Sequence, residues 1–233
     1  MSQYTGTDNL EAMEEALNYN GFLLSLIRNQ LRPGMKVLDI GTGIGTFARS
    51  LCDEGYDVVC FEPDPNQAAY LQLNGLCVRR SLADIEASHF DFIYALNVLE
   101  HIEDDHNALI QWYRLLKPGG RMLIYVPAFN LLFSSMDKKV GHYRRYKCGD
   151  LVNLINKAGG NLIKIRYVDS LGFFMSLLYK YKNDGTGDLN RTALRIYDNF
   201  IFPLSRILDL FISGVLGKNV YAIAHLKEQV VGA

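Results

Sequence analysis

The chain has 233 residues, 49% of them hydrophobic, and this length predicts one α/β domain with a full core rather than two domains. Its net charge of −1 gives no electrostatic reason to expect a nucleic-acid or anionic-membrane partner. The four cysteines lack C-x-x-C spacing, which disfavours a zinc site or a disulfide framework and favours a reducing compartment, the cytoplasm. Residues 1–9 are polar and indicate no secretory signal, and no apolar stretch is long enough to span a bilayer.

Apolar residues recur at helical spacing over residues 10–30 and predict an N-terminal helix, with Gly21 as the place for a bend. From residue 36 onward, strand-like runs alternate with helical patterns. Such alternation with short links predicts a parallel sheet. The expected strands cover 36–39, 58–62, 77–79, 92–96 and 122–126, and the expected helices cover 47–52, 66–73 and a segment on which Leu109, Trp112, Tyr113 and Leu116 share one face.

The pattern changes beyond Pro127, where an aromatic and basic segment at 128–147 precedes a helix that ends at Gly159. Residues 162–168 and 220–226 predict two further strands. Between them, an apolar insert at 171–217 carries charges of both signs, and a loop at 183–187 divides it into two helical halves. We expect a single domain, with an N-terminal helical segment (1–32), a core (33–170), a helical cap (171–217) and a last strand with a tail (218–233).

A glycine-rich turn follows the first expected strand. The strand ends in the carboxylate of Asp39, and glycines at 41, 43 and 45 allow a tight turn and a close approach of the backbone to a ligand. The G-x-G-x-G spacing lacks the glycine that the dinucleotide fingerprint needs at Thr46, which points away from NAD. The turn therefore predicts a nucleotide-type cradle.

Acidic residues follow the next two strands. Glu62 lies 21 positions beyond Gly41, where an acid can accept hydrogen bonds from both hydroxyls of a ribose. Asp84 follows the third strand and offers a carboxylate to an exocyclic amine, with apolar neighbours such as Ile85 that could sandwich an aromatic base. Ligands of open α/β sheets bind at this carboxyl edge of the strands.

The order of these parts, together with residues 97–102 and 116–121, resembles the class I methyltransferases that depend on S-adenosylmethionine (SAM). The resemblance covers roughly residues 30–170 and the last strand. It implies an α/β fold with a Rossmann-like, doubly wound, seven-stranded and mostly parallel sheet, whose last strand is antiparallel, and to this fold the chain adds the α-helical cap insert. It also implies SAM as the cofactor and S-adenosylhomocysteine as the product.

The resemblance assigns roles to individual residues. It places Asp39, Gly41 and Gly43 beside the methionine moiety and Asn97 at the methionine end, while Glu62 holds the ribose and Asp84 meets the adenine amino group. The segment around Tyr19 resembles a helix that closes over the cofactor in related enzymes. The expected cofactor-binding residues are Tyr19, Asp39, Gly41, Thr42, Gly43, Glu62, Pro63, Asp84, Ile85 and Asn97.

Residues 137–146 resemble a G-H-x-R-R-Y segment of a subset of these enzymes, some of which accompany saccharide or lipid-linked glycan pathways. Methyl transfer from a sulfonium chiefly requires alignment of donor and acceptor. An acceptor hydroxyl or amine must also lose a proton, and His142 is the candidate catalytic base because histidine titrates near neutral pH. The expected substrate contacts, by stacking or by bidentate hydrogen bonds, are Tyr143, Arg144, Arg145 and Tyr146.

No metal site is expected, because His142 has no second ligand three or four residues away, and Glu100 and His101 are interpreted as packing or capping residues at a helix start. We predict a methyltransferase for a small-molecule or glycan/lipid-type acceptor, with oxygen as the preferred atom. The alternatives are a non-catalytic cofactor-binding module and, less favoured, a nucleotide-dependent oxidoreductase.

Nucleic acid is not expected as a substrate, since no basic tract with interleaved aromatic residues extends beyond 138–147. The insert at 171–217 is expected to pack on the domain as a cap, with a peripheral membrane contact or a lipid-substrate groove as alternatives. The sequence leaves the oligomeric state open.

Overall fold

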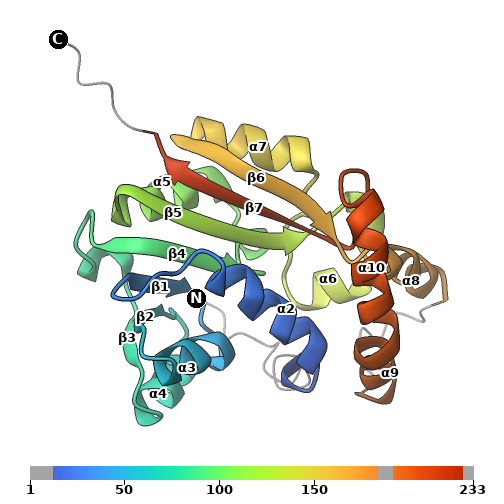
Figure 1. Cartoon of the computed structure of the whole chain (residues 1–233), viewed down its shortest axis with the longest axis horizontal. Coiled ribbons are helices and arrows are strands. Elements are labelled where there is room, and N and C mark those ends of the chain that lie inside the picture. Colours follow the sequence, from blue (N-terminus) through green and yellow to red (C-terminus); the bar gives the residue numbers. More distant parts are fainter. Residues whose placement is uncertain (1–12, 183–190, 228–233) are drawn as a thin grey trace.

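The computed structural model describes residues 13–182 and 191–227, which form one seven-stranded sheet (Figure 1). The strand order is β3-β2-β1-β4-β5-β7-β6. Neighbouring strands from β3 to β5 are parallel, whereas β7 is antiparallel to both β5 and β6. This confirms the predicted sheet. The strands are β1 (Lys36–Ile40), β2 (Asp57–Phe61), β3 (Cys77–Arg79), β4 (Phe90–Leu96), β5 (Leu116–Pro127), β6 (Gly160–Val168) and β7 (Asn219–Leu226).

Helices cover both faces of the sheet, so the doubly wound arrangement is also confirmed (Figure 1). Side chains alternate between the faces because the side-chain period of a strand is two. In β5, Met122 and Ile124 pack with α5 and α7, while Leu123 and Tyr125 pack with α2, α3 and α4. These helices are α2 (Leu17–Arg28), α3 (Thr46–Asp53), α4 (Pro65–Leu73), α5 (Asp105–Leu115) and α7 (Cys148–Lys157), and a short α6 (Ser135–Lys139) precedes α7.

The insert is helical, as predicted, and two of its aspartates bind helix ends. It contains α8 (Ser170–Lys182), α9 (Arg191–Ile196), a π-helical turn (Tyr197–Ile201) and α10 (Phe202–Ile212), while the predicted loop at 183–187 lies outside the described residues. Asp209 of α10 accepts hydrogen bonds from the backbone N–H groups of Asp169 and Ser170, at 2.9 and 3.0 Å, and so caps α8.

Asp198 gives α2 the N-terminal cap that its own sequence lacks. The residue before α2, Ala16, has no side-chain acceptor, and the Asp198 carboxylate accepts from the N–H groups of Asn18 and Tyr19, both at 2.9 Å. Because 180 residues separate Asn18 from Asp198 in sequence, this cap ties the insert to the N-terminal helix.

Several elements differ from the predictions, three of them in helical segments. Helix α2 runs through Gly21 without a break and ends at Arg28. Leu116 begins β5 rather than ending α5, because the helix stops just before Pro118, which lacks an N–H group. Glu100 lies in a single 3₁₀ turn, Leu99–His101, ahead of α5. Within residues 13–182 and 191–227, no helix is both long enough and apolar enough to cross a membrane.

Candidate active site

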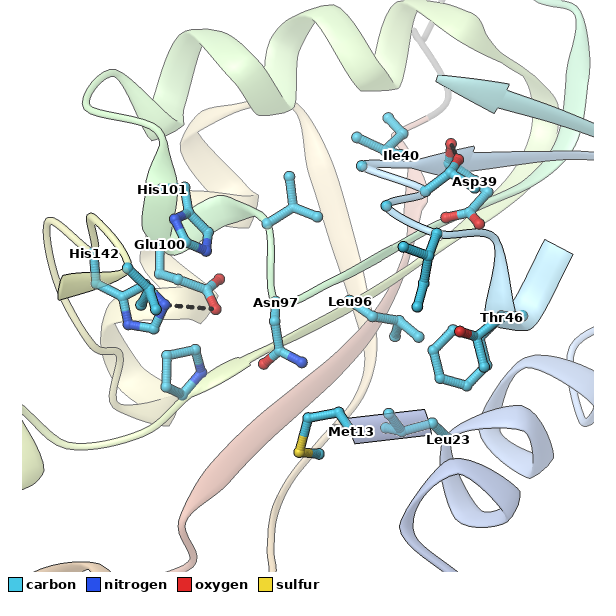
Figure 2. Close-up of a pocket in the computed structure, with 18 of the residues that line it drawn as sticks. Met13, Leu23, Asp39, Ile40, Thr46, Leu96, Asn97, Glu100, His101 and His142 are labelled. Carbon is cyan, nitrogen blue, oxygen red and sulfur yellow. Dashed lines mark hydrogen bonds and ion pairs between the residues drawn. The ribbon is translucent and has the colours of Figure 1, made fainter. Parts of the chain in front are cut away.

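A cavity of about 1200 Å³ opens at the carboxyl end of the parallel strands. Ligand pockets commonly measure about 300–1,000 Å³, so this cavity has room for more than one small molecule. Most of the sequence-predicted residues line it: Tyr19, Asp39, Gly41, Thr42, Gly43, Glu62, Pro63, Asn97, His142 and Arg145. Figure 2 shows Asp39 and Ile40 at one side of this space and Glu100, His101 and His142 at the other.

The glycine turn has the geometry that its sequence predicts. Gly41, Gly43 and Gly45 all have positive φ, at 71°, 59° and 87°, a backbone region that favours glycine. A Cβ atom on Gly41 would lie 2.5 Å from Cγ2 of Val98, so both conformation and space require glycine there. Thr42 completes the turn by donating its hydroxyl hydrogen to the Asp39 carbonyl at 3.1 Å.

The two predicted acids of the cradle are both buried. Glu62 accepts hydrogen bonds from the N–H groups of Gly43 and Asp64, at 2.8 and 3.0 Å. Burial nevertheless raises its pKa, against the lowering effect of these two bonds. Burial also raises the pKa of Asp39 to about 7, and the neighbouring Glu62 carboxylate acts in the same direction. This end of the cavity therefore holds two buried carboxyl groups, one of which is bound by backbone amides.

Asn97 and Tyr19 also line the cavity. Asn97 directly follows β4 with φ of 54°, and its N–H group donates to the Tyr125 carbonyl at 2.7 Å. This sparsely populated conformation directs the residue after the strand into the cavity (Figure 2). The Tyr19 ring packs edge-on against Tyr125 and Phe202, so α2 and α10 together cover this side.

His142 is held at the far end of the cavity by Asp137, an acid for which the sequence predicted no role. Its Nδ1 lies 2.8 Å from Oδ1 of Asp137, and Arg145 donates two hydrogen bonds to the same carboxylate, at 2.8 and 2.9 Å. Although burial alone would raise it, these bonds hold the pKa of Asp137 well below its usual range. An ionised carboxylate only accepts hydrogen bonds, so Nδ1 carries the hydrogen and the Nε2 lone pair of the neutral ring remains available.

Two further groups face His142. The Glu100 side chain is fully buried, and burial raises its pKa to about 8. Its Oε1 lies 3.9 Å from Nε2 of His142, and the ring of His101 meets the ring of His142 edge-on at 4.5 Å. Burial lowers the pKa of His101 to about 4, and the neighbouring His142 acts in the same direction. The chain thus gathers two imidazoles and a carboxyl group at one point.

The other residues of the G-H-x-R-R-Y segment lie outside the cavity lining. Arg144 pairs with Asp105 at 2.8 Å, and the buried Tyr146 hydroxyl donates to the same carboxylate at 2.9 Å. The Tyr143 side chain is exposed, while its N–H group donates to the Glu100 carbonyl at 2.8 Å. The segment therefore fixes the position of His142, and the predicted substrate contacts of these three residues stay predictions.

Asp84 and Ile85 are also not among the residues that line the cavity. Asp84 is exposed in a 3₁₀ turn after β3, and Ile85 is buried in the core. Their neighbour Leu82 does line the cavity, so the turn reaches it with an apolar side chain. The predicted contact of Asp84 with an adenine amino group stays a prediction.

The insert and the strand after it add cavity residues that the sequence did not indicate. Tyr197 donates a hydrogen bond to the buried Asp169 carboxylate, and Lys218 donates its N–H group to the Asp169 carbonyl at 2.9 Å. Burial lowers the pKa of the Lys218 side chain. Sequence spacing gave no signal for this group, because Asp169 and Lys218 are distant in sequence and meet only in the fold.

Comparison with known proteins agrees with this geometry. A family model described as a methyltransferase domain matches residues 12–164. Phosphoethanolamine N-methyltransferase 2 of Caenorhabditis elegans is 34% identical over 105 residues, which are 40% of this chain and 24% of that protein. Ubiquinone biosynthesis O-methyltransferase of Pseudomonas entomophila is 29% identical over 99 residues, or 38% and 43% of the two chains. The chain spans less than half the length of either relative.

Two solved structures share the fold. A SAM-dependent methyltransferase from Thermotoga maritima superposes with a TM-score of 0.65 at 17% identity, over 96% of both chains. Phosphoethanolamine N-methyltransferase 2 of Haemonchus contortus, solved with phosphomonomethylethanolamine and S-adenosylhomocysteine, gives 0.64 at 21% identity, over 98% of this chain and 58% of that one.

The sheet order and the cradle at its carboxyl edge define a Rossmann-like fold of the methyltransferase type. The family model covers well over half of the chain. The chain therefore belongs to the methyltransferase domain family, which confirms the family predicted from the sequence.

Proposed function

We propose that this chain transfers a methyl group from SAM to a hydroxyl group of a small-molecule or glycan/lipid-type acceptor. The observation that carries the proposal is a continuous cavity with two chemically different ends. Gly41, Gly43, Asp39 and Glu62 form the cofactor end, and His142 with its Asp137 partner forms the acceptor end. SAM supplies an activated methyl group when it binds, and the chain's own residues hold the two reactants in line.

The proton of the acceptor passes to His142. Because Asp137 accepts the Nδ1 hydrogen, Nε2 can take the hydroxyl proton as the new O–C bond forms. Arg145 keeps Asp137 ionised and in place, so that the carboxylate also stabilises the imidazolium that results. The cap residues Leu194 and Tyr197 also line the cavity.

The charges around the acceptor end favour a neutral hydroxyl over a phosphate-bearing acceptor. Arg145 is bound to Asp137, and Arg144 is turned to Asp105 outside the cavity. The apolar residues Ile102 and Val140, one next to His101 in the sequence and the other bonded to it, line the cavity, as does Trp112. An acceptor with an apolar body and one reactive oxygen fits this lining.

Calorimetry and a methyl-transfer assay test the proposal. SAM should bind the native chain, and Glu62→Gln should weaken binding at least tenfold, whereas the exposed control Glu86→Gln should not. His142→Ala should lower turnover about a hundredfold with SAM affinity unchanged. Unchanged affinity in Glu62→Gln would refute the cofactor site, and SAM binding without methyl transfer to any hydroxyl acceptor would indicate a non-catalytic module.

We also propose that the insert contacts a membrane surface peripherally. Its described residues expose an apolar set made of Phe200, Leu204, Ile207, Leu210, Phe211 and Val215. The insert's Arg195 and Arg206 are paired with Glu15 and Asp209, so attachment should depend little on salt. Flotation with phosphatidylcholine vesicles should carry the native chain and lose the double variant Leu210→Asp/Phe211→Asp. Equal flotation of both proteins would refute the contact.

The reducing cytoplasm is the proposed compartment, and free cysteines support it. Cys52, Cys60, Cys77 and Cys148 all lie in the described part of the chain, and each is a free thiol there.

A further inference from the structure

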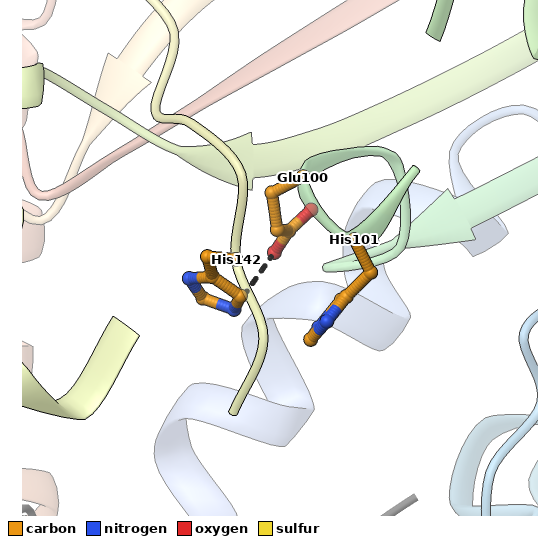
Figure 3. Close-up of side chains that lie close together, drawn as sticks. All are labelled: Glu100, His101 and His142. Carbon is orange, nitrogen blue, oxygen red and sulfur yellow. Dashed lines mark ion pairs between the residues drawn. The ribbon is translucent and has the colours of Figure 1, made fainter. Parts of the chain in front are cut away.

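Three side chains with metal-binding atoms meet at the acceptor end of the cavity (Figure 3). Glu100 and His101 come from the 3₁₀ turn after β4, and His142 comes from the loop after α6. One ligand atom of each lies within 4.8 Å of the others. The backbone bond from the Tyr143 N–H group to the Glu100 carbonyl, at 2.8 Å, holds the two segments together.

Glu100 is the member that indicates a ligand. Its side chain is fully buried, and neither carboxyl oxygen has a hydrogen-bond partner among the residues that the structure describes. An unpartnered buried carboxyl group is costly, because the group loses water and gains nothing in exchange. Since Glu100 lines the cavity, a bound cation or donor can supply the missing partner there.

The two imidazoles are oriented as metal ligands are. In metal sites, a ligating histidine usually donates its second ring N–H to a carboxylate or a backbone carbonyl, which fixes the ring and its tautomer. Asp137 does this for Nδ1 of His142 at 2.8 Å and leaves Nε2 directed at Glu100. His101 has a backbone hydrogen bond with Val140, which fixes its ring in the same way.

We propose that Glu100, His101 and His142 bind one divalent first-row transition-metal ion, and that this ion holds the acceptor oxygen. Two imidazoles and one carboxylate suit Zn²⁺ or Fe²⁺ better than Mg²⁺ or Ca²⁺, which prefer oxygen ligands. Three protein ligands leave a coordination position open toward the cavity. Ligand atoms about 2.1 Å from a tetrahedral ion lie about 3.4 Å from one another. The three ligand atoms here lie up to 4.8 Å apart, so the widest pair must move about 1.4 Å closer when the ion binds.

The inference rests on the proposed function and changes how the acceptor is activated. In the metal-loaded chain, the ion binds the hydroxyl oxygen and lowers its pKa, so the proton leaves to water and His142 serves as a ligand. The oxygen lone pair then forms the O–CH₃ bond, while the electron pair of the S–CH₃ bond stays on sulfur. In the metal-free chain, the same Nε2 atom takes the proton. Both states give a methyl ether and S-adenosylhomocysteine.

Metal binding is measured on the whole chain without SAM, after treatment with EDTA and exchange into chelator-free buffer. Titration with Zn²⁺ should show one site per chain, and Co²⁺ should give the visible absorption bands of a low-coordinate site. Glu100→Gln and His101→Ala should each weaken Zn²⁺ binding at least tenfold and remove the Co²⁺ bands. The matched control is His89→Ala, since His89 lies at the surface near Glu86.

Each outcome decides the inference. Native affinity for Zn²⁺ no tighter than that of Glu100→Gln, or an equal loss in His89→Ala, would overturn it. Failure of the native chain to bind Zn²⁺ would overturn it, and if that chain still transfers methyl groups, the proposed function stays intact. Stoichiometric Zn²⁺ binding by a chain that does not bind SAM would refute the proposed function alone. If Glu100→Gln does not fold, His101→Ala gives the same readout.

Discussion

Replacing Asp39 with asparagine should make folding stability less sensitive to pH. Asp39 is only 4% exposed, and burial raises its pKa to about 7 from the ordinary value of 3.8. The unfolded chain therefore releases this proton near pH 4, whereas the folded chain keeps it until about pH 7. Since the unfolded state gives up its proton first, rising pH favours unfolding throughout that window.

The magnitude follows from the width of the window. Each pH unit between the two pKa values costs about 1.4 kcal/mol, so Asp39 should remove about 2 to 3 kcal/mol of stability between about pH 5 and about pH 8. Urea unfolding followed by the fluorescence of Trp112, which is the single tryptophan and is buried, measures this loss. Asparagine has nearly the same shape as aspartate but does not titrate. The loss of unfolding free energy between about pH 5 and about pH 8 should therefore be about 2 to 3 kcal/mol smaller in Asp39→Asn than in the native chain.

Glu62 lies beside Asp39 and also has a raised pKa. Because the two carboxyl groups interact, the difference between the two curves measures Asp39 together with its coupling to Glu62. Parallel stability curves for the native chain and Asp39→Asn would refute the reasoning. The same variant should bind SAM at least tenfold more weakly at about pH 8, where the native carboxylate is ionised and faces a cationic ligand.

Three further substitutions test the frame of the site. Gly41→Ala should cost about 1 to 2 kcal/mol for the left-handed backbone alone and more for the contact with Val98, which a lower melting temperature would register. Asp198→Ala should cost about 1 kcal/mol through the lost cap of α2 and should raise the KM for SAM, and an unchanged KM would separate α2 from cofactor binding. Arg145→Met should cost about 3 kcal/mol, because it leaves Asp137 buried with one partner fewer, and equal urea midpoints would contradict this.

The geometry of the glycine turn and of Glu62 was predictable because its determinants are local. A strand, three glycines and an acid at the end of the next strand lie within about 25 residues, and each has one conformation that suits it. Gly41 needs positive φ, and Glu62 lies directly after β2, where two N–H groups reach it. Asp84 lies in a turn of the predicted type, but in this turn Leu82 lines the cavity and Asp84 does not. A local pattern therefore predicts the turn without fixing which of its side chains reaches the cavity.

The acceptor end was only partly predictable because its contacts join distant segments. His142 was found from its neighbours in the sequence, but Glu100 lies 42 positions earlier and meets it only through the fold. Local spacing around His142 therefore gave no indication of a second metal ligand. Arg144 and Tyr146 suit substrate binding by residue type and are bound to Asp105 in the structure, so residue type alone did not indicate this partner.

The buried carboxyl groups around the cavity are of two kinds. Some are hydrogen-bonded within the fold, and one has no partner in the described part of the fold and is a candidate ligand-binding group. Glu62 accepts two backbone hydrogen bonds, and Asp137 accepts bonds from His142 and Arg145, so folding itself compensates their burial. Glu100 receives no such bond from the described residues. Because an uncompensated buried polar group lowers stability, Glu100 would serve the fold better as an apolar residue. Burial of Glu100 therefore lowers the stability of the ligand-free chain, and a ligand that binds Glu100 restores that stability.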